Sequence, residues 1–100
     1  MRSVDLCLGL PADIILYAVL LILVARATRK VAGTLNFSMG DTHIYDNHVD
    51  AFLSKQASQE PLEPPTWSLA LESTLDNFEP RHFTLNDYKH GPRIDYALNT

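Results

Sequence analysis

The sequence predicts an α+β fold, with two helices packed on about four short and mostly antiparallel strands. An unbroken apolar run at residues 14–25 has the length of a helix, and apolar and polar residues alternate in several short stretches further along. Proline- and glycine-containing breaks separate these stretches. The chain of 100 residues is one domain at most, and its 46% hydrophobic and 20% charged residues are ordinary for a globular protein.

The first helix is expected to run from Asp13 to about residue 30. Asp13 is a plausible N-cap, because its carboxylate can accept hydrogen bonds from the exposed amides of the first turn. Gly33 is expected to end the segment. Three basic side chains fall in the last turn, where they oppose the negative end of the helix dipole: Arg26, Arg29 and Lys30.

The apolar run within this helix, residues 14–25, raises the question of a membrane. It holds twelve residues, whereas a spanning helix needs roughly twenty. It also has the length of a signal-peptide core, but the segment before it carries Asp5 and Asp13 against one base, Arg2. We therefore expect a helix buried in a globular core and no membrane association. A signal or anchor segment of a small secreted protein stays open as the alternative.

Five further elements follow, and their apolar spacing predicts each of them. A second helix is expected from Asp46 or Asn47 to about residue 57, and the proline-rich stretch 60–65 cannot be helical. The buried face of this helix is expected to hold Val49, Phe52 and Leu53. The apolar residues of the four strands are, in chain order, Leu35, Phe37 and Met39; Trp67, Leu69 and Leu71; Phe83 and Leu85; and Ile94, Tyr96 and Leu98. A turn is expected around Pro80.

Charge and cysteine content exclude several classes of protein. The net charge is −4 and the eight lysines and arginines are scattered, so nucleic-acid binding is not expected. The single cysteine, Cys7, rules out an internal disulfide framework and fits a reducing compartment, so we expect a cytoplasmic protein. Cys7 and the four histidines match no zinc spacing, and no metal is expected.

Two polar clusters could carry chemistry. Arg2 and Ser3 place a guanidinium beside a hydroxyl, which suits a phosphate, although an exposed terminus would have the same composition. Residues 40–48 gather histidines, aspartates, a tyrosine and an asparagine after an apolar stretch; such a cluster favours either a ligand site or a capped turn. Cys7 lies between two leucines and is interpreted as buried packing rather than as a nucleophile.

Taken together, these segments resemble the C-terminal portion of the thymidylate synthase family. The likeness covers essentially the whole chain in one order. It is carried by four stretches: Arg2-Ser3-x-Asp5, Leu8-Gly9-Leu10-Pro11, Gly40-Asp41-Thr42-His43-Ile44-Tyr45 with Asn47-His48, and a closing set of Asp87-Tyr88, Pro92 and Ile94. The resemblance implies that residues 1–100 form the C-terminal part of a thymidylate synthase-like domain, a homodimer in its full-length form.

The resemblance also implies a substrate, a cofactor and the residues that hold them. The substrate is a pyrimidine nucleoside monophosphate and the cofactor is 5,10-methylenetetrahydrofolate. Arg2 and Ser3 would hold the phosphate, Asp13 would recognise the base, and His43 and Tyr45 would hold the sugar hydroxyl. Asp5 and Gly9 would lie near the pterin. The family's catalytic cysteine lies upstream of the first matching stretch and Cys7 does not match it, so the isolated chain is expected to be inactive.

One departure from the family pattern bears on the base. Where thymidylate synthases read Phe-Asn after the Leu-Gly-Leu-Pro stretch, this chain reads Ala12-Asp13. An ionised carboxylate only accepts hydrogen bonds, so it suits the exocyclic amine of cytosine better than the C4 carbonyl of uracil. Asp13 therefore resembles the deoxycytidylate hydroxymethylase branch, with dCMP as substrate. An ordinary thymidylate synthase acting on dUMP, and a non-catalytic nucleotide-binding remnant, stay open as alternatives.

Overall fold

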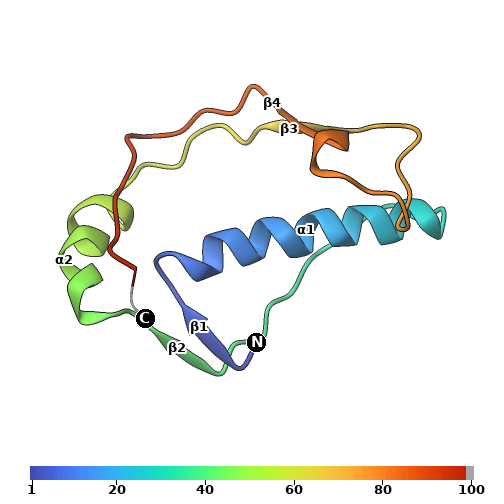
Figure 1. Cartoon of the computed structure of the whole chain (residues 1–100). Coiled ribbons are helices and arrows are strands. Elements are labelled where there is room, and N and C mark those ends of the chain that lie inside the picture. Colours follow the sequence, from blue (N-terminus) through green and yellow to red (C-terminus); the bar gives the residue numbers. More distant parts are fainter. Residues whose placement is uncertain (99–100) are drawn as a thin grey trace.

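The computed structural model describes residues 1–98, which form one long helix flanked by two separate pairs of strands. β1 (Ser3–Asp5) and β2 (Asp41–His43) pair in parallel, and β3 (Thr66–Leu69) and β4 (Phe83–Asn86) pair antiparallel. The helix α1 (Gly9–Ala27) lies between them, with β3 and β4 above it and β1 and β2 below it (Figure 1). The α+β class is confirmed, but only one of the two strand pairs is antiparallel.

The start of α1 differs from the sequence prediction. The helix begins at Gly9 with Leu8 as its N-cap, so Asp13 lies in the helix interior and is not the cap. The Asp5 carboxylate instead accepts from the amide of Gly9, the first residue of the helix, at 3.3 Å, and from the amide of Cys7 in the preceding turn at 3.4 Å. The prediction failed because Pro11 was interpreted as preceding the helix, whereas proline is tolerated in the first turn, where amides lack partners.

The end of α1 also differs from expectation, since Gly33 plays no part in it. The helix ends at Ala27, and the next backbone bonds run from Arg29 N to Arg26 O (3.2 Å) and from Lys30 N to Ala25 O (2.8 Å). Arg29 has a φ of 57°, the left-handed conformation that closes a Schellman motif. Glycine usually occupies that position; here an arginine takes it.

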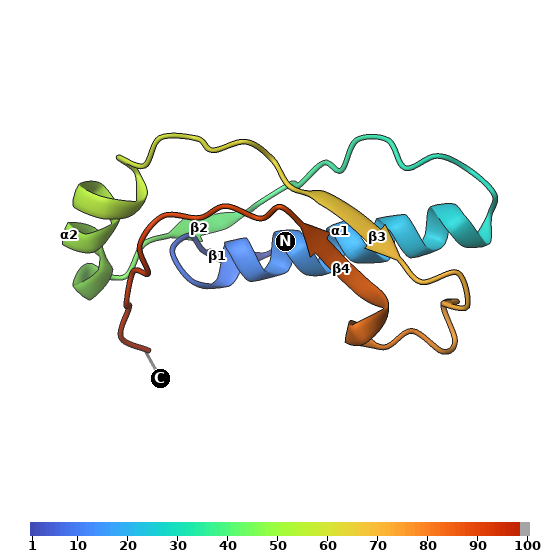
Figure 2. The same cartoon turned by 90° about the horizontal axis from the view of Figure 1, so that it is seen from above.

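Arg26 joins α1 to the antiparallel hairpin. Its guanidinium donates to the carbonyl oxygens of Ala70 (2.6 Å) and Leu69 (3.2 Å), at the end of β3. These bonds link residues more than forty positions apart, and seen from above the hairpin crosses over the helix (Figure 2). The expected interaction of Arg26 with the helix dipole is therefore accompanied by a direct tertiary contact.

The expectation that α1 is buried on all sides is not met within residues 1–98. Leu23 is its only buried residue, and Ile15 and Leu16 are 60% and 63% exposed. The remaining described elements cover only part of the helix surface. By length and composition alone α1 could also cross a membrane, but core helices of soluble proteins and signal sequences meet the same criterion.

The second helical segment begins where the sequence predicts. Its hydrogen bonding changes along its length, from a 3₁₀ turn at Asp46–His48 (η1) through α2 (Val49–Ala51) to a π-helical stretch at Phe52–Gln56 (η2). Val49 and Phe52 are half-buried, but Leu53 is 63% exposed, so the predicted apolar face is only partly correct. Residues 60–65 are not helical, as the prolines require.

Two of the four predicted strands form. β3 and β4 contain Trp67 and Phe83, whose rings stack at 6.1 Å, and the turn around Pro80 is the 3₁₀ helix η3 (Pro80–His82). Leu71 falls outside β3 and is 94% exposed. The strands predicted at residues 35–39 and 94–98 do not form in the described part of the chain. Neither segment has a neighbouring strand there with which to form a hydrogen-bonded ladder.

Gly40 controls the β1–β2 junction. Its amide donates to Met1 O, and the Asp41 amide donates to Arg2 O, both at 2.8 Å. A Cβ atom added at Gly40 would lie 2.9 Å from Arg2 O, a backbone atom, whereas one added at Gly33 would meet nothing within 4 Å. The strand junction therefore depends on a residue without a side chain.

We predict that Gly40→Ala loosens the β1–β2 pair while Gly33→Ala does not. Overpacking against backbone costs about 1–3 kcal/mol, so the Asp41 and Leu6 amides, which bond across the two strands, should exchange hydrogen about ten- to a hundredfold faster. Amide hydrogen exchange measured by NMR checks this. Unchanged protection of both amides in Gly40→Ala would contradict it.

Candidate functional site

The parallel pairing of β1 and β2 brings two distant polar clusters of the sequence side by side. Ser3 lies opposite Asp41 and Asp5 lies opposite His43, and the ladder is extended by a bond from Leu6 N to His43 O at 2.9 Å. The first and third stretches of the resemblance therefore form neighbouring strands. The strand pair therefore carries polar side chains from both clusters, with Asp5 and His43 directly opposite each other.

Arg2 and Ser3 are exposed, and their side chains make no hydrogen bond or ion pair within residues 1–98. The Arg2 carbonyl accepts from the Asp41 amide, and Ser3 belongs to the β1–β2 ladder. The guanidinium and the hydroxyl are thus available to an anion. The backbone bond fixes the point on the strand from which the Arg2 side chain departs.

A row of aromatic rings continues from the end of β2. His43, Tyr45, His48 and Tyr96 follow one another with centroid separations of 5.2, 5.6 and 4.8 Å. The His43 imidazole also lies 3.3 Å from Asp41 O. The two residues expected to hold a sugar hydroxyl, His43 and Tyr45, are therefore in direct ring contact.

Two members of this row were given no role by the sequence analysis. His48 is 1% exposed, and its Nε2 lies 2.6 Å from the carbonyl oxygen of Ala97. Tyr96 donates its hydroxyl to Gln56 Oε1 at 2.5 Å. His48 stands in a stretch that matches the family, and that was its only signal. Nothing in local sequence ties Tyr96 to this row, since the contact joins distant parts of the chain.

Cys7 lies behind the row and is buried, as predicted. Burial raises the pKa of the Tyr96 phenol, and the interaction with Cys7 raises that pKa further. The phenol therefore stays protonated around neutral pH and can keep donating to Gln56. These contacts hold the chain's final described residues against the start of α1.

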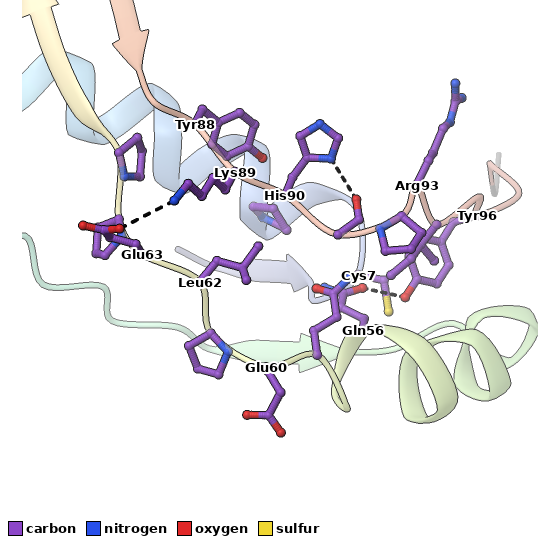
Figure 3. A pocket seen from close by; sticks show the side chains of 18 residues that line it. Cys7, Gln56, Glu60, Leu62, Glu63, Tyr88, Lys89, His90, Arg93 and Tyr96 are labelled. Atoms are coloured by element: carbon purple, nitrogen blue, oxygen red, sulfur yellow. Dashed lines mark hydrogen bonds and ion pairs between the residues drawn. The ribbon is translucent and has the colours of Figure 1, made fainter.

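A broad groove of about 1140 Å³ opens beside this contact (Figure 3). It lies between the start of α1, where Cys7 and Pro11 line it, and the segments 59–65 and 88–94. Lys89 and Glu63 face each other at 3.7 Å on its wall. Asp5 and Gly9, expected near a pterin, are not among its lining residues, although the turn they form adjoins it in sequence.

Asp13 stands apart from the strand cluster. It is half-buried on α1, and its carboxylate makes no hydrogen bond or ion pair within the described part of the chain. The structure pairs Ser3 with Asp41 and Asp5 with His43, and it brings the rings of His43 and Tyr45 together. It shows no contact of Asp13 with any of these residues. Within residues 1–98 no group of three or more histidine, cysteine, aspartate or glutamate side chains could hold a metal ion.

Comparisons with known proteins agree with one another. The family model described as "Thymidylate synthase" matches residues 1–100. The thymidylate synthase of Herpesvirus ateles is 36% identical over 98 residues, which are 97% of this chain and 33% of that protein. That of Francisella philomiragia is 35% identical over 99 residues, which are 98% of this chain and 36% of that protein.

A solved structure gives the same result for the fold. The thermostable thymidylate synthase A of Bacillus subtilis superposes with a TM-score of 0.86 at 33% identity, covering 97% of this chain and 35% of that one. The chain thus spans about a third of the length of the relatives it matches. The matched region contains the paired strands, the ring row and α1, and on this evidence the chain belongs to the thymidylate synthase family.

Proposed function

We propose that this chain is the nucleotide-binding portion of a folate-dependent pyrimidine nucleotide C5 one-carbon transferase. The observation that carries the proposal is the parallel β1–β2 pairing, in which Ser3 lies opposite Asp41 and Asp5 lies opposite His43. Arg2 and Ser3 stand at the start of this short strand pair, and His43 and Tyr45 stand at its end and just beyond it. A nucleotide's phosphate and sugar hydroxyl are close to each other, so the groups that bind them must also be close. The family membership supports the same assignment.

The phosphate would bind to Arg2 and Ser3. A guanidinium offers a planar pair of donors that matches two phosphate oxygens, and the Ser3 hydroxyl can donate to a third. Both side chains are exposed and make no other polar contact within residues 1–98. His43 and Tyr45 would bind the sugar hydroxyl, with the His43 ring supported by its contact with Tyr45.

Asp13 would recognise the base, and the structure removes the main competing explanation for it. As an N-cap Asp13 would serve only the helix, but the N-cap is Leu8 and Asp13 lies within the helix. A half-buried carboxylate in an apolar helix, with no partner in the described chain, has its accepting capacity available for a ligand.

We propose cytosine as the base and dCMP as the substrate. An ionised carboxylate accepts from the exocyclic amine of cytosine, whereas against uracil it would face another acceptor. A second candidate is dUMP, which the names of the relatives favour, since they are called thymidylate synthases. The two candidates differ in what replacement of Asp13 by an amide should do.

The cofactor would be 5,10-methylenetetrahydrofolate, which supplies the one-carbon unit when bound. The turn from Asp5 to Gly9 contains Cys7 and leads to Pro11, and both of these residues line the groove, so the cofactor would bind beside it. Asp5 would orient this turn through its bonds to the Cys7 and Gly9 amides. We further propose that the complete protein is a cytoplasmic homodimer, as family membership suggests.

We predict that the 100-residue chain alone transfers no one-carbon unit. Its only cysteine is buried and does not match the family's nucleophile, and a thiol needs exposure and an activating neighbour to attack a base. Incubation with dCMP or dUMP and methylenetetrahydrofolate, followed by chromatographic detection of the modified nucleotide, checks this. Turnover above the protein-free control would refute it.

We predict that Asp13→Asn shifts the base preference of the complete protein from dCMP toward dUMP. The amide offers both a donor and an acceptor, and a mispaired buried polar group costs about 1–3 kcal/mol, so the ratio of the two affinities should change about ten- to a hundredfold. Isothermal titration with both nucleotides measures the ratio, and kcat/KM does so where turnover occurs.

Asp50→Asn is the matched control, because Asp50 is exposed on α2 and the same chemical change there should leave the ratio unaltered. Phosphate binding through Arg2 and Ser3 should persist in both variants. If Asp13→Asn leaves the dCMP-to-dUMP ratio unchanged, the carboxylate does not recognise the base and the cytidylate assignment fails.

A further inference from the structure

We propose that His48 is a positioning residue for the sugar-binding tyrosine. It holds the ring of Tyr45 in place and links that ring to the chain's final segment through Ala97. The inference rests on the function proposed above, because it requires a nucleotide whose sugar hydroxyl meets Tyr45. It adds a residue to that site and assigns a role to its buried histidine.

His48 is the one buried member of the ring row. It is the largest fully buried side chain within residues 1–98, at 1% exposure. Its Nε2 lies 2.6 Å from Ala97 O, and a carbonyl only accepts, so this nitrogen carries the proton. The ring of Tyr96 at 4.8 Å supports it from the side of the final segment. The orientation of the imidazole is therefore set from the far side.

Tyr45 depends on His48 in two ways. Its carbonyl accepts the His48 amide at 2.8 Å, which closes the first turn of η1. Its ring meets the His48 imidazole edge-on at 5.6 Å and the His43 imidazole at 5.2 Å. One side of the tyrosine is thus packed between two imidazoles.

The other side of Tyr45 is open. The residue is 39% exposed, and its hydroxyl makes no hydrogen bond to any residue in the range 1–98. A hydroxyl that is left free on a ring whose position is fixed is suited to a ligand, because little conformational entropy is lost on binding. His48 would supply that fixed position without touching the nucleotide.

The alternative is that His48 only fills the core. A core-filling role and a positioning role both lower stability when the histidine is replaced, so stability cannot separate them. The two roles differ in their effect on binding of the ligand's 3′-hydroxyl. Only the positioning role links His48 to recognition of the 3′-hydroxyl.

The test compares binding of a 2′-deoxynucleotide with its 2′,3′-dideoxy analogue, using the complete protein and the base that the wild type prefers. One hydrogen bond corresponds to about a three- to tenfold preference for the hydroxylated ligand. His48→Phe keeps a ring but cannot donate to the Ala97 carbonyl, and it should abolish this preference, so that both ligands bind about equally well. His48→Gln can still donate through its amide and should retain part of the preference.

Two further variants sharpen the comparison. Tyr96→Phe keeps the ring beside His48 and removes the hydroxyl that contacts Gln56 and Cys7, so the preference should remain. In a Tyr45→Phe background, which lacks the proposed sugar contact, His48→Phe should change the preference no further. This non-additivity is expected because both substitutions act on one contact.

The outcomes separate this inference from the proposed function. Equal weakening of both ligands by His48→Phe and His48→Gln, with the wild-type preference kept, would show a merely structural role and overturn the inference alone. Unchanged binding of both ligands in both variants would overturn it as well. A wild-type protein that binds neither nucleotide would overturn the proposed function and this inference with it.

Discussion

The parallel pairing of β1 and β2 is the interaction on which the rest of the structure depends. The pair is only three residues long on each side, yet it places the ends of a forty-residue stretch of chain together. Gly40 permits the pairing because it has no side chain where the two backbones approach closely. Asp5, the last residue of β1, accepts hydrogen bonds from the Cys7 amide in the following turn and from the Gly9 amide at the start of α1. Strand register, helix start and candidate site are therefore set within one small region.

The helix α1, by contrast, is poorly covered: its apolar surface is larger than the area that the other described elements bury. A helix that is apolar all round suits a position covered on every side. In the Bacillus subtilis relative the matched region is 35% of the chain, so that protein has many more residues that could cover such a helix. Arg26 shows that at least one contact of the helix with the rest of this chain is specific, since it engages two carbonyl oxygens of the hairpin.

Sequence patterns predicted those features that depend on neighbouring residues. The alternation around Trp67 and Phe83 and the turn at Pro80 were correct, because hairpins are local structures. The start of α1 was predicted at Asp13, after Pro11, but the helix begins at Gly9. Proline is compatible with both positions, because it can precede a helix or lie in its first turn. Residues 35–39 show the pattern of a strand but lack a partner, and pairing is a tertiary property.

The same distinction holds for the candidate site. Arg2, Ser3, His43 and Tyr45 were identified by their resemblance to a family. Only the strand register showed that the two segments carrying them lie side by side. The contact of His48 with Ala97 spans 49 positions, and no periodicity or spacing rule connects residues so far apart. Asp13 differs from these residues, because its proposed role was suggested by a departure from the family pattern. The structure shows that Asp13 is not the N-cap of α1, which was the alternative explanation for it.

The most direct test of the account is whether one nucleotide meets both strands and α1 together. Backbone amide shifts of the complete protein, followed by NMR during titration with dCMP, report on each region separately. The account predicts that amides at residues 2–5, 12–14 and 43–45 shift and saturate at one common concentration. Shifts confined to residues 2–5, or saturation at different concentrations in the three regions, would contradict a single site built on the β1–β2 pair.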